Sequence, residues 1–145
     1  MAQTRPTAGF TLIEVVIALA IVAITTTFAI ASYHGYLLRG HRIEAMQALL
    51  AAAAEQEKFH LAHGHYGDRL DAVPGSDPPG LPVASRTLRG RYRLAVETAD
   101  ASTFRVVATA ADQGGDPLCL RMSIDESGRR SAADAAGSDS TVKCW

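Results

Sequence analysis

The sequence lacks the short motifs around which many enzyme sites are built. It has no glycine-rich phosphate loop, no paired-cysteine framework for zinc and no nucleophile elbow. Its scattered Ser, His and Asp residues form no recognisable catalytic triad. The formal net charge is only −1, unlike that of a dedicated nucleic-acid binder. We therefore expect a protein that is not an enzyme and that needs no cofactor.

Charge is almost absent from one long stretch near the amino terminus. Between Phe10 and Ala31, Glu14 is the only charged residue. About 20 apolar residues suffice to cross a bilayer as a helix, so residues 10–32 are predicted to be a transmembrane segment. The stretch is too long for the apolar part of a secretory signal, and no small-residue cleavage site follows it. The basic residues on either side give no clear orientation.

A short polar leader, residues 1–9, precedes this stretch. It ends in Gly9, the apolar run begins at once with Phe10, and Glu14 lies four residues further on. From Gly9 to Glu14 this order resembles the type IV prepilin family position by position. The resemblance implies that a prepilin peptidase clips the chain after Gly9 and N-methylates Phe10. It also implies that residues 10–32 become the core of a filament.

Glu14 needs an explanation, because an ionised carboxylate is costly in hydrocarbon. It could lie shallowly, about 6 Å along the helix from Phe10, and reach the lipid headgroups. Alternatively, cleavage creates an α-amine on Phe10 that neutralises Glu14 of a neighbouring subunit in an apolar bundle. The second role sets the axial register of assembly and is the one that the resemblance implies. Phe10 and Glu14 are therefore the predicted assembly residues.

The helix is expected to continue beyond the apolar stretch, from Phe10 to about Leu61. Residues 33–62 form its amphipathic half, with many strong helix formers. One apolar stripe at helical spacing is predicted to face the core. It consists of Ile43, Met46, Leu50, Ala53, Ala54 and Leu61.

The apolar half differs from the family in one respect. The resemblance implies a Gly and a Pro where this chain has Ala23 and Ala31. Three threonines, Thr25 to Thr27, could replace that weak point, since their hydroxyls compete for backbone carbonyls. Alternatively, they are ordinary small residues at a helix–helix contact.

The composition changes after the helix. Prolines and glycines make residues 63–90 an irregular connecting loop. Residues 91–145 then show apolar alternation typical of three strands, around Tyr92 to Val96, Phe104 to Ala108, and Leu118 to Ile124. We expect an antiparallel β meander packed on the helix. The fold class is thus α+β, the type IV pilin fold.

The two cysteines lie in this last segment. Cys119 and Cys144 are an even pair in a small domain, which suits a disulfide and an oxidising compartment. The alternative is two unpaired thiols. A disulfide-bounded carboxyl tail is also a usual feature of the family that the leader resembles. The ending around these cysteines looks most like that of PilE-type minor pilins.

Two other clusters allow alternative chemistry. His60, His63 and His65, with Asp68 nearby, could bind zinc or nickel, but histidines also gather at helix ends, where a cation favours the helix dipole. A basic stripe could contact DNA phosphates, although an outward polar strand face explains it adequately. This stripe comprises Arg86, Arg89, Arg91 and Arg93. Neither a metal site nor direct DNA contact is the favoured interpretation.

The sequence therefore predicts a minor pilin of a type IV pilus that serves twitching motility, adhesion or DNA uptake. Its expected partners are other pilin subunits, the prepilin peptidase and the pilus assembly machinery of the inner membrane. We expect a single pass through the inner membrane with the head in the periplasm, and then a place in a surface pilus. The alternative is a pseudopilin of type II secretion, although pseudopilins commonly lack a disulfide-bounded tail. A further alternative is a single-span periplasmic binding or sensor protein.

Overall fold

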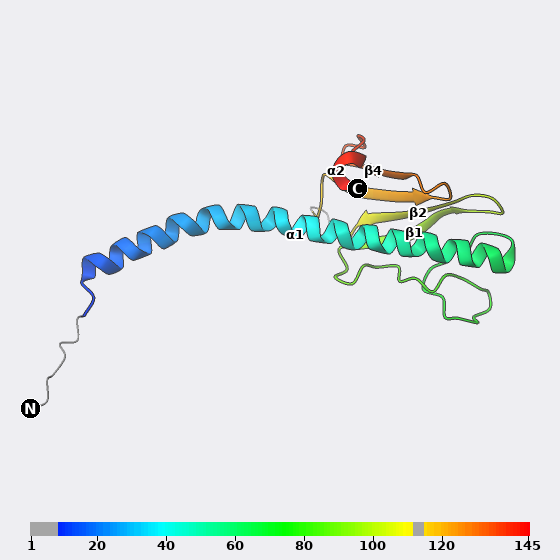
Figure 1. Ribbon diagram of the computed structural model, residues 1–145, viewed down its shortest axis with the longest axis horizontal. Helices are drawn as coiled ribbons and strands as arrows, with labels where there is room; N and C mark the ends of the chain where they lie inside the picture. The colour runs from blue at the N-terminus through cyan, green and yellow to red at the C-terminus, as the bar shows by residue number, and fades with distance from the viewer. Residues whose placement is uncertain (1–8, 112–114) are drawn as a thin grey trace, which may run out of the picture. The chain divides into compact units, whose positions relative to one another are not determined.

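The structure, a computed structural model, describes residues 9–111 and 115–145, without the side chains of residues 28–32. It contains helix α1 (Leu12–His63), strands β1 (Tyr92–Ala99), β2 (Phe104–Ala110), β3 (Arg121–Asp125) and β4 (Arg130–Ala133), and helix α2 (Thr141–Cys144), all labelled or traceable in Figure 1. The chain divides into two compact units, residues 1–37 and 38–145. The first eight residues of the predicted leader lie outside the described residues.

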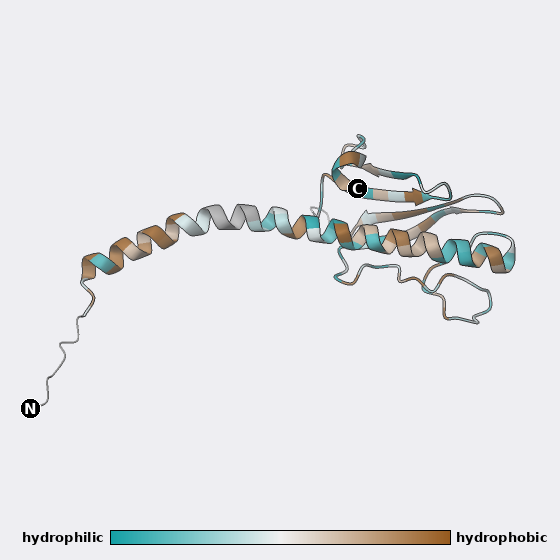
Figure 2. Cartoon of the chain, in the orientation of Figure 1, coloured by the Kyte–Doolittle hydropathy of each residue, from teal (hydrophilic) through white to brown (hydrophobic). Residues whose placement is uncertain are grey.

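The first unit is the amino-terminal part of α1, whose surface is mostly hydrophobic in Figure 2. The helix begins after Thr11, whose hydroxyl and carbonyl oxygens accept hydrogen bonds from the backbone N–H of Glu14 at 3.4 and 3.1 Å. Among the described residues, none of the helices meets the length and hydropathy expected of a membrane span. The predicted span over residues 10–32 includes five residues whose side chains are not described.

The three threonines of this unit bond to their own helix. The Thr25 hydroxyl donates to the carbonyl of Ile21 at 3.0 Å, and the Thr26 hydroxyl to that of Val22 at 2.6 Å. The Thr27 hydroxyl donates to a carbonyl one turn back at 2.6 Å. Each hydroxyl is thus satisfied within the helix, which runs on through this segment.

The second unit contains one antiparallel sheet in the order β1-β2-β3-β4. Figure 1 shows the strands on one side of the carboxyl-terminal half of α1. The meander that the sequence predicts is present, but it has a fourth strand. The third strand begins at Arg121, so Leu118 and Leu120 precede it rather than belong to it. The sequence analysis missed β4 because its four residues, Arg130–Ala133, have little β propensity.

The predicted apolar stripe of α1 is wrong in part: Met46 and Ala53 pack against the core, but the other four members are exposed. Ile43, Leu50 and Leu61 are 50%, 42% and 87% exposed. The buried positions lie on a neighbouring stripe with the same spacing, namely Ala45, Leu49, Ala52, Gln56 and Phe59. Both stripes satisfy helical periodicity, and only the position of the sheet decides between them. The buried stripe packs mainly on inward side chains of the sheet: Tyr92, Leu94, Phe104, Val106, Ala108, Met122 and Ile124.

The end of α1 is fixed by a glycine and a buried glutamine. Gly64 has φ +75°, and its N–H donates to the carbonyl of His60 at 2.8 Å, as is typical of a residue that ends a helix. The Gln56 amide then makes two hydrogen bonds to the backbone of Gly67, at 2.7 and 2.8 Å. These bonds hold the start of the connecting loop against the helix.

Candidate functional site

The outer face of the sheet is the face turned away from α1, and arginines dominate its charge. Along β1, Tyr92 and Leu94 are buried while Arg93 between them is exposed, which confirms the predicted alternation. The same alternation places Arg105 of β2 and Arg121 of β3 on the outer face. Glu97 and Asp125 are acids on this face.

Two of these arginines, Arg93 and Arg121, fall in a single row with Arg86. Residues paired directly across antiparallel strands share a face, and strands lie about 4.8 Å apart. Arg86 pairs with Arg93, Arg93 with Thr109, and Thr109 with Arg121. All four are exposed. We call Arg86, Arg93, Thr109 and Arg121 the basic row. It spans about 15 Å of the outer face.

The row continues beyond Arg121 to the edge of the sheet. Arg121 pairs with Ala133 of β4, which forms a bridge with Asp139. Arg121 also makes a hydrogen-bonded ion pair with Glu97 at 2.5 Å. Because Glu97 lies on β1 and Arg121 on β3, this pair crosses over β2. Val107 of β2 faces outward as well, and it is only 4% exposed.

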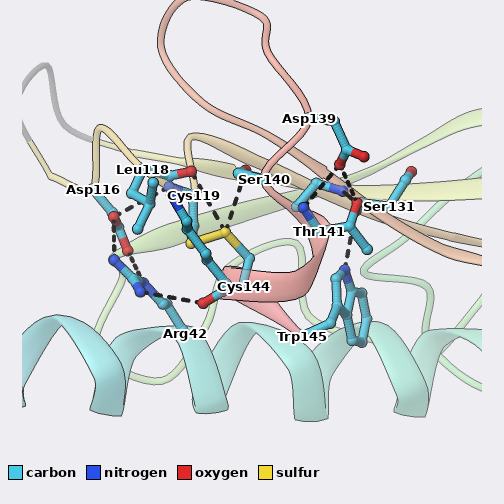
Figure 3. The surroundings of a disulfide bond; sticks show 12 residues. Arg42, Asp116, Leu118, Cys119, Ser131, Asp139, Ser140, Thr141, Cys144 and Trp145 are labelled. Carbon is cyan, nitrogen blue, oxygen red and sulfur yellow. Dashed lines mark hydrogen bonds and ion pairs between the residues drawn. A yellow bond between two sulfur atoms is a disulfide. The ribbon is translucent and has the colours of Figure 1, made fainter.

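The carboxyl tail is attached to the head by the disulfide that the sequence predicts. Cys119 and Cys144 are bonded, with their Cα atoms 5.7 Å apart. The tail is also held by Trp145, whose indole N–H donates to the carbonyl of Ser131 at 3.0 Å. Arg130 stacks over the same ring, 5.2 Å from its centre. Figure 3 shows Trp145 on one side of the disulfide and Arg42 on the other.

A buried ion pair stands beside the disulfide. Arg42 of α1 binds both carboxylate oxygens of Asp116, at 2.5 and 2.9 Å. The single proton of the Tyr92 hydroxyl has two acceptors within reach, Asp116 at 3.2 Å and the carbonyl of Cys119 at 2.9 Å. The Cys119 N–H donates to Asp116 at 3.2 Å. One carboxylate therefore joins the helix, β1 and the disulfide.

The electrostatics of this pair follow from its contacts. Burial favours the neutral acid, but the hydrogen bond and charge of Arg42 outweigh it, and the pKa of Asp116 is lowered. The hydrogen bond to Asp116 raises the pKa of Arg42. Burial, followed by the nearby carboxylate, raises the pKa of Tyr92. The pair is thus ionised at neutral pH, and the tyrosine is a neutral donor.

The histidines do not gather into a metal site. His60 bonds to the carbonyl of Ala101, and its ring stacks on Tyr66 at 4.4 Å. The ring of His63 stacks on Phe59 at 4.1 Å. Among the described residues, no group of three His, Cys, Asp or Glu side chains is arranged to hold a metal ion. The arrangement is that of an aromatic cluster at the end of α1.

The predicted assembly residues lie together on the first unit. Phe10 is 82% exposed. It lines an apolar hollow of about 330 Å³ with Glu14, which is the one ionisable residue there. The other lining residues are aliphatic: Val15, Ala18, Leu19 and Val22.

Sequence reasoning missed two parts of the second unit. Arg42 and Asp116 are 74 residues apart, and no local pattern connects them. Arg121, in contrast, could have been assigned to the outer face, because Met122 and Ile124 alternate with it inward. Its position in one row with Arg93, on the other side of Thr109, depends on strand register, which the sequence alone does not show.

The long helix, the four-stranded sheet and the disulfide-bounded tail make up the type IV pilin fold. A family profile described as "Type IV minor pilin ComP, DNA uptake sequence receptor" matches residues 31–123. A second profile, "Prokaryotic N-terminal methylation motif", matches residues 4–30. The chain belongs to the type IV minor pilin ComP family.

Two curated relatives agree with this assignment. "Type IV major pilin protein PilE1" of Neisseria gonorrhoeae is 29% identical over 92 residues, 63% of this chain and 40% of that protein. "Fimbrial protein" of Neisseria meningitidis serogroup B is 30% identical over 89 residues, 61% of this chain and 48% of that protein. The chain therefore spans less than half the length of the curated relatives that it matches.

Proposed function

We propose that this protein is a minor subunit of a type IV pilus and that its head binds DNA for uptake. The family match is the observation that carries the proposal. A pseudopilin of type II secretion is not favoured, because the matched family is one of minor pilins and the tail is closed by a disulfide. The peptidase and the inner-membrane assembly machinery act on the chain before it enters the fibre.

The exposed apolar surface of the first unit supports assembly. Large aliphatic side chains such as Leu12, Ile13 and Leu19 are 83%, 62% and 63% exposed in the isolated chain. A surface of this kind requires lipid or neighbouring subunits to cover it. The inner membrane covers it first, and the bundle of other pilins covers it in the fibre.

Cleavage after Gly9 supplies the partner for Glu14. The new amine of Phe10 carries a positive charge at neutral pH, with an ordinary pKa of about 8. The methylated amine keeps that charge. In a fibre, the amine of one subunit pairs with Glu14 of a neighbour, and the apolar side chains around Glu14 and on the packed neighbours exclude water from the pair.

We predict that Glu14→Gln lowers incorporation into fibres about tenfold or more, equivalent to at least ~1.4 kcal/mol. A neutral amide cannot compensate the charge of the amine in an apolar bundle. The measurement is the ratio of fibre-bound to membrane-bound protein by quantitative immunoblot. A matched control is Glu57→Gln on the exposed surface of α1, which should incorporate normally. Normal incorporation of Glu14→Gln would show that the pair is not needed.

The basic row supports DNA binding. Arg86 and Arg93 are exposed and directly paired, Arg121 lies two strands beyond Arg93, and guanidinium groups bind phosphate through paired hydrogen bonds. The face also carries Arg105, which stands across from Asp125. The low net charge of the chain disfavours direct DNA contact, but Arg86 pairs with Arg93 and Arg93 with the threonine of the row, so no acid among the described residues stands directly across the strands from either arginine and this end of the row is locally positive.

We predict that the full-length protein in detergent binds a labelled duplex with a strong salt dependence. Arg93→Ala should reduce the slope of log affinity against log salt by about 0.9, because one phosphate contact is lost. Lys58→Ala, an exposed lysine of α1, should leave the slope unchanged. Fluorescence anisotropy across a salt series measures the affinity and its salt slope for the wild type and for each variant. Binding that is absent at low salt, or that does not depend on salt, would rule out the DNA-binding role.

A further inference from the structure

A small pocket, with a few polar groups among mostly apolar walls, lies where the basic row reaches the edge of the sheet. It has a volume of about 260 Å³. It is lined by Arg121 and Ser123 of β3, residues Ser131, Ala132 and Ala133 of β4, and Gly137 and Asp139 of the loop that follows. Ser123 pairs with Ser131, and Arg121 pairs with Ala133, which shows that these side chains share the outer face. The pocket therefore continues the row that we propose for DNA.

The loop that forms the rim of the pocket is held by hydrogen bonds. One carboxylate oxygen of Asp134 accepts bonds from the N–H of Ala136 and Ser138, both at 2.9 Å. The Asp134 N–H donates to the carbonyl of Ser138 at 3.0 Å. The N–H of Ala135 donates to the carbonyl of Pro117 at 2.8 Å. These bonds fix Gly137 and Asp139 in place, so the pocket is already formed in the free chain.

The pocket offers both donors and acceptors. Arg121 uses Nη2 for Glu97, and the other four of its five N–H groups make no hydrogen bond among the described residues. The hydroxyls of Ser123 and Ser131 lie 2.7 Å apart, and whichever one accepts still has a proton to donate. Asp139 accepts from Thr141 at Oδ1, and its Oδ2 makes no hydrogen bond among those residues. Figure 3 shows this carboxylate beside Thr141.

The charges of the pocket determine which chemical group of DNA its donors and acceptors can bind. The hydrogen bonds from Thr141 lower the pKa of Asp139, so its carboxylate is ionised at neutral pH. It stands at the same pocket as Arg121, where it repels a phosphate. A neutral planar group with acceptors for arginine and a donor for aspartate is the better match. Arginine and carboxylate side chains read base edges in this way.

Resting on the function proposed above, we propose that this pocket binds one unpaired nucleobase of DNA held along the basic row. The volume suits a single base rather than a base pair, since pockets for drug-sized ligands begin at about 300 Å³. Arg121 donates to the acceptors of the base, and Asp139 accepts from its amino or imino group. Arg86 and Arg93 then supply affinity through phosphates, and the pocket with Arg121 supplies discrimination through the base.

The test compares a mixed-sequence 12-nucleotide single strand with an abasic strand of the same length. Full-length protein in detergent is titrated against each by fluorescence anisotropy. The wild type should prefer the strand with bases about tenfold, which lies within the range of discrimination given by one good base contact. Ser131→Leu fills the pocket and should reduce the preference below about threefold, with the salt slope unchanged. Ala95→Leu adds the same bulk to the outer face away from the pocket and should keep the preference.

A second variant provides an independent test in case Ser131→Leu does not fold. Asp139→Asn keeps the size of the side chain and the acceptor for Thr141, and it should also lower the preference. The pocket proposal is overturned if the wild type binds both strands equally, or if both pocket variants keep the wild-type preference. If neither single strand binds at low salt while the labelled duplex does, the pocket proposal alone fails; if the duplex does not bind either, the DNA-binding function fails, and the pocket proposal fails with it.

Discussion

Asp116→Asn is expected to lower the free energy of unfolding by about 3 kcal/mol, because it leaves a largely buried guanidinium without its counter-charge. The Arg42 side chain is only 15% exposed, and that of Asp116 is 3% exposed. The asparagine also disturbs the bonds to Tyr92 and Cys119 that the carboxylate accepts. Thermal and urea unfolding of the full-length protein in detergent, followed by far-UV circular dichroism, would measure the effect.

The same variant should change the response to acid. The folded pKa of Asp116 lies below its unfolded value, which is about 3.9. Its contribution to stability is therefore complete above that value and is lost as the pH falls through the folded pKa. Asp116→Asn should lack this part of the acid dependence. Asp68→Asn, an exposed aspartate, is the control and should change stability by no more than about 0.5 kcal/mol. A wild-type acid profile in Asp116→Asn would contradict this account.

Removing the disulfide is expected to have an effect of similar size. The bond joins residues 25 positions apart, and the chain-entropy estimate for such a loop is about 3.5 kcal/mol. The double variant Cys119→Ser/Cys144→Ser should lose about this much stability. A reductant should lower the stability of the wild type to the same level and should leave the double variant unchanged.

Trp145 gives this experiment a local readout. It is the only tryptophan in the chain, follows Cys144 directly and binds the carbonyl of Ser131. If the disulfide holds the tail on β4, reduction should expose the indole and shift its emission to the red before the whole unit unfolds. An emission spectrum and a midpoint that a reductant does not change would show that the tail stays in place without the bond.

The parts of the fold that could be predicted from the sequence are those with a local cause. The apolar run, the glycine after His63 and the alternation around Tyr92 each indicate an element through neighbouring residues. The two cysteines left few alternatives for a cross-link.

Other parts depend on tertiary context. Two stripes of α1 have equivalent spacing, and the position of the sheet selects the one with Ala45 and Leu49. Strand β4 is a short segment that becomes a strand because it pairs with β3. The basic row and its pocket require the register of four strands, which no single segment encodes.

Quantitative mass spectrometry of fibres sheared from native cells tests the central claim most directly. The account predicts an N-methylated peptide that starts at Phe10, present in the fibres at a small fraction of the dominant subunit. An intact leader through Gly9, or a clipped protein confined to the membrane fraction, would contradict a minor subunit of a type IV pilus.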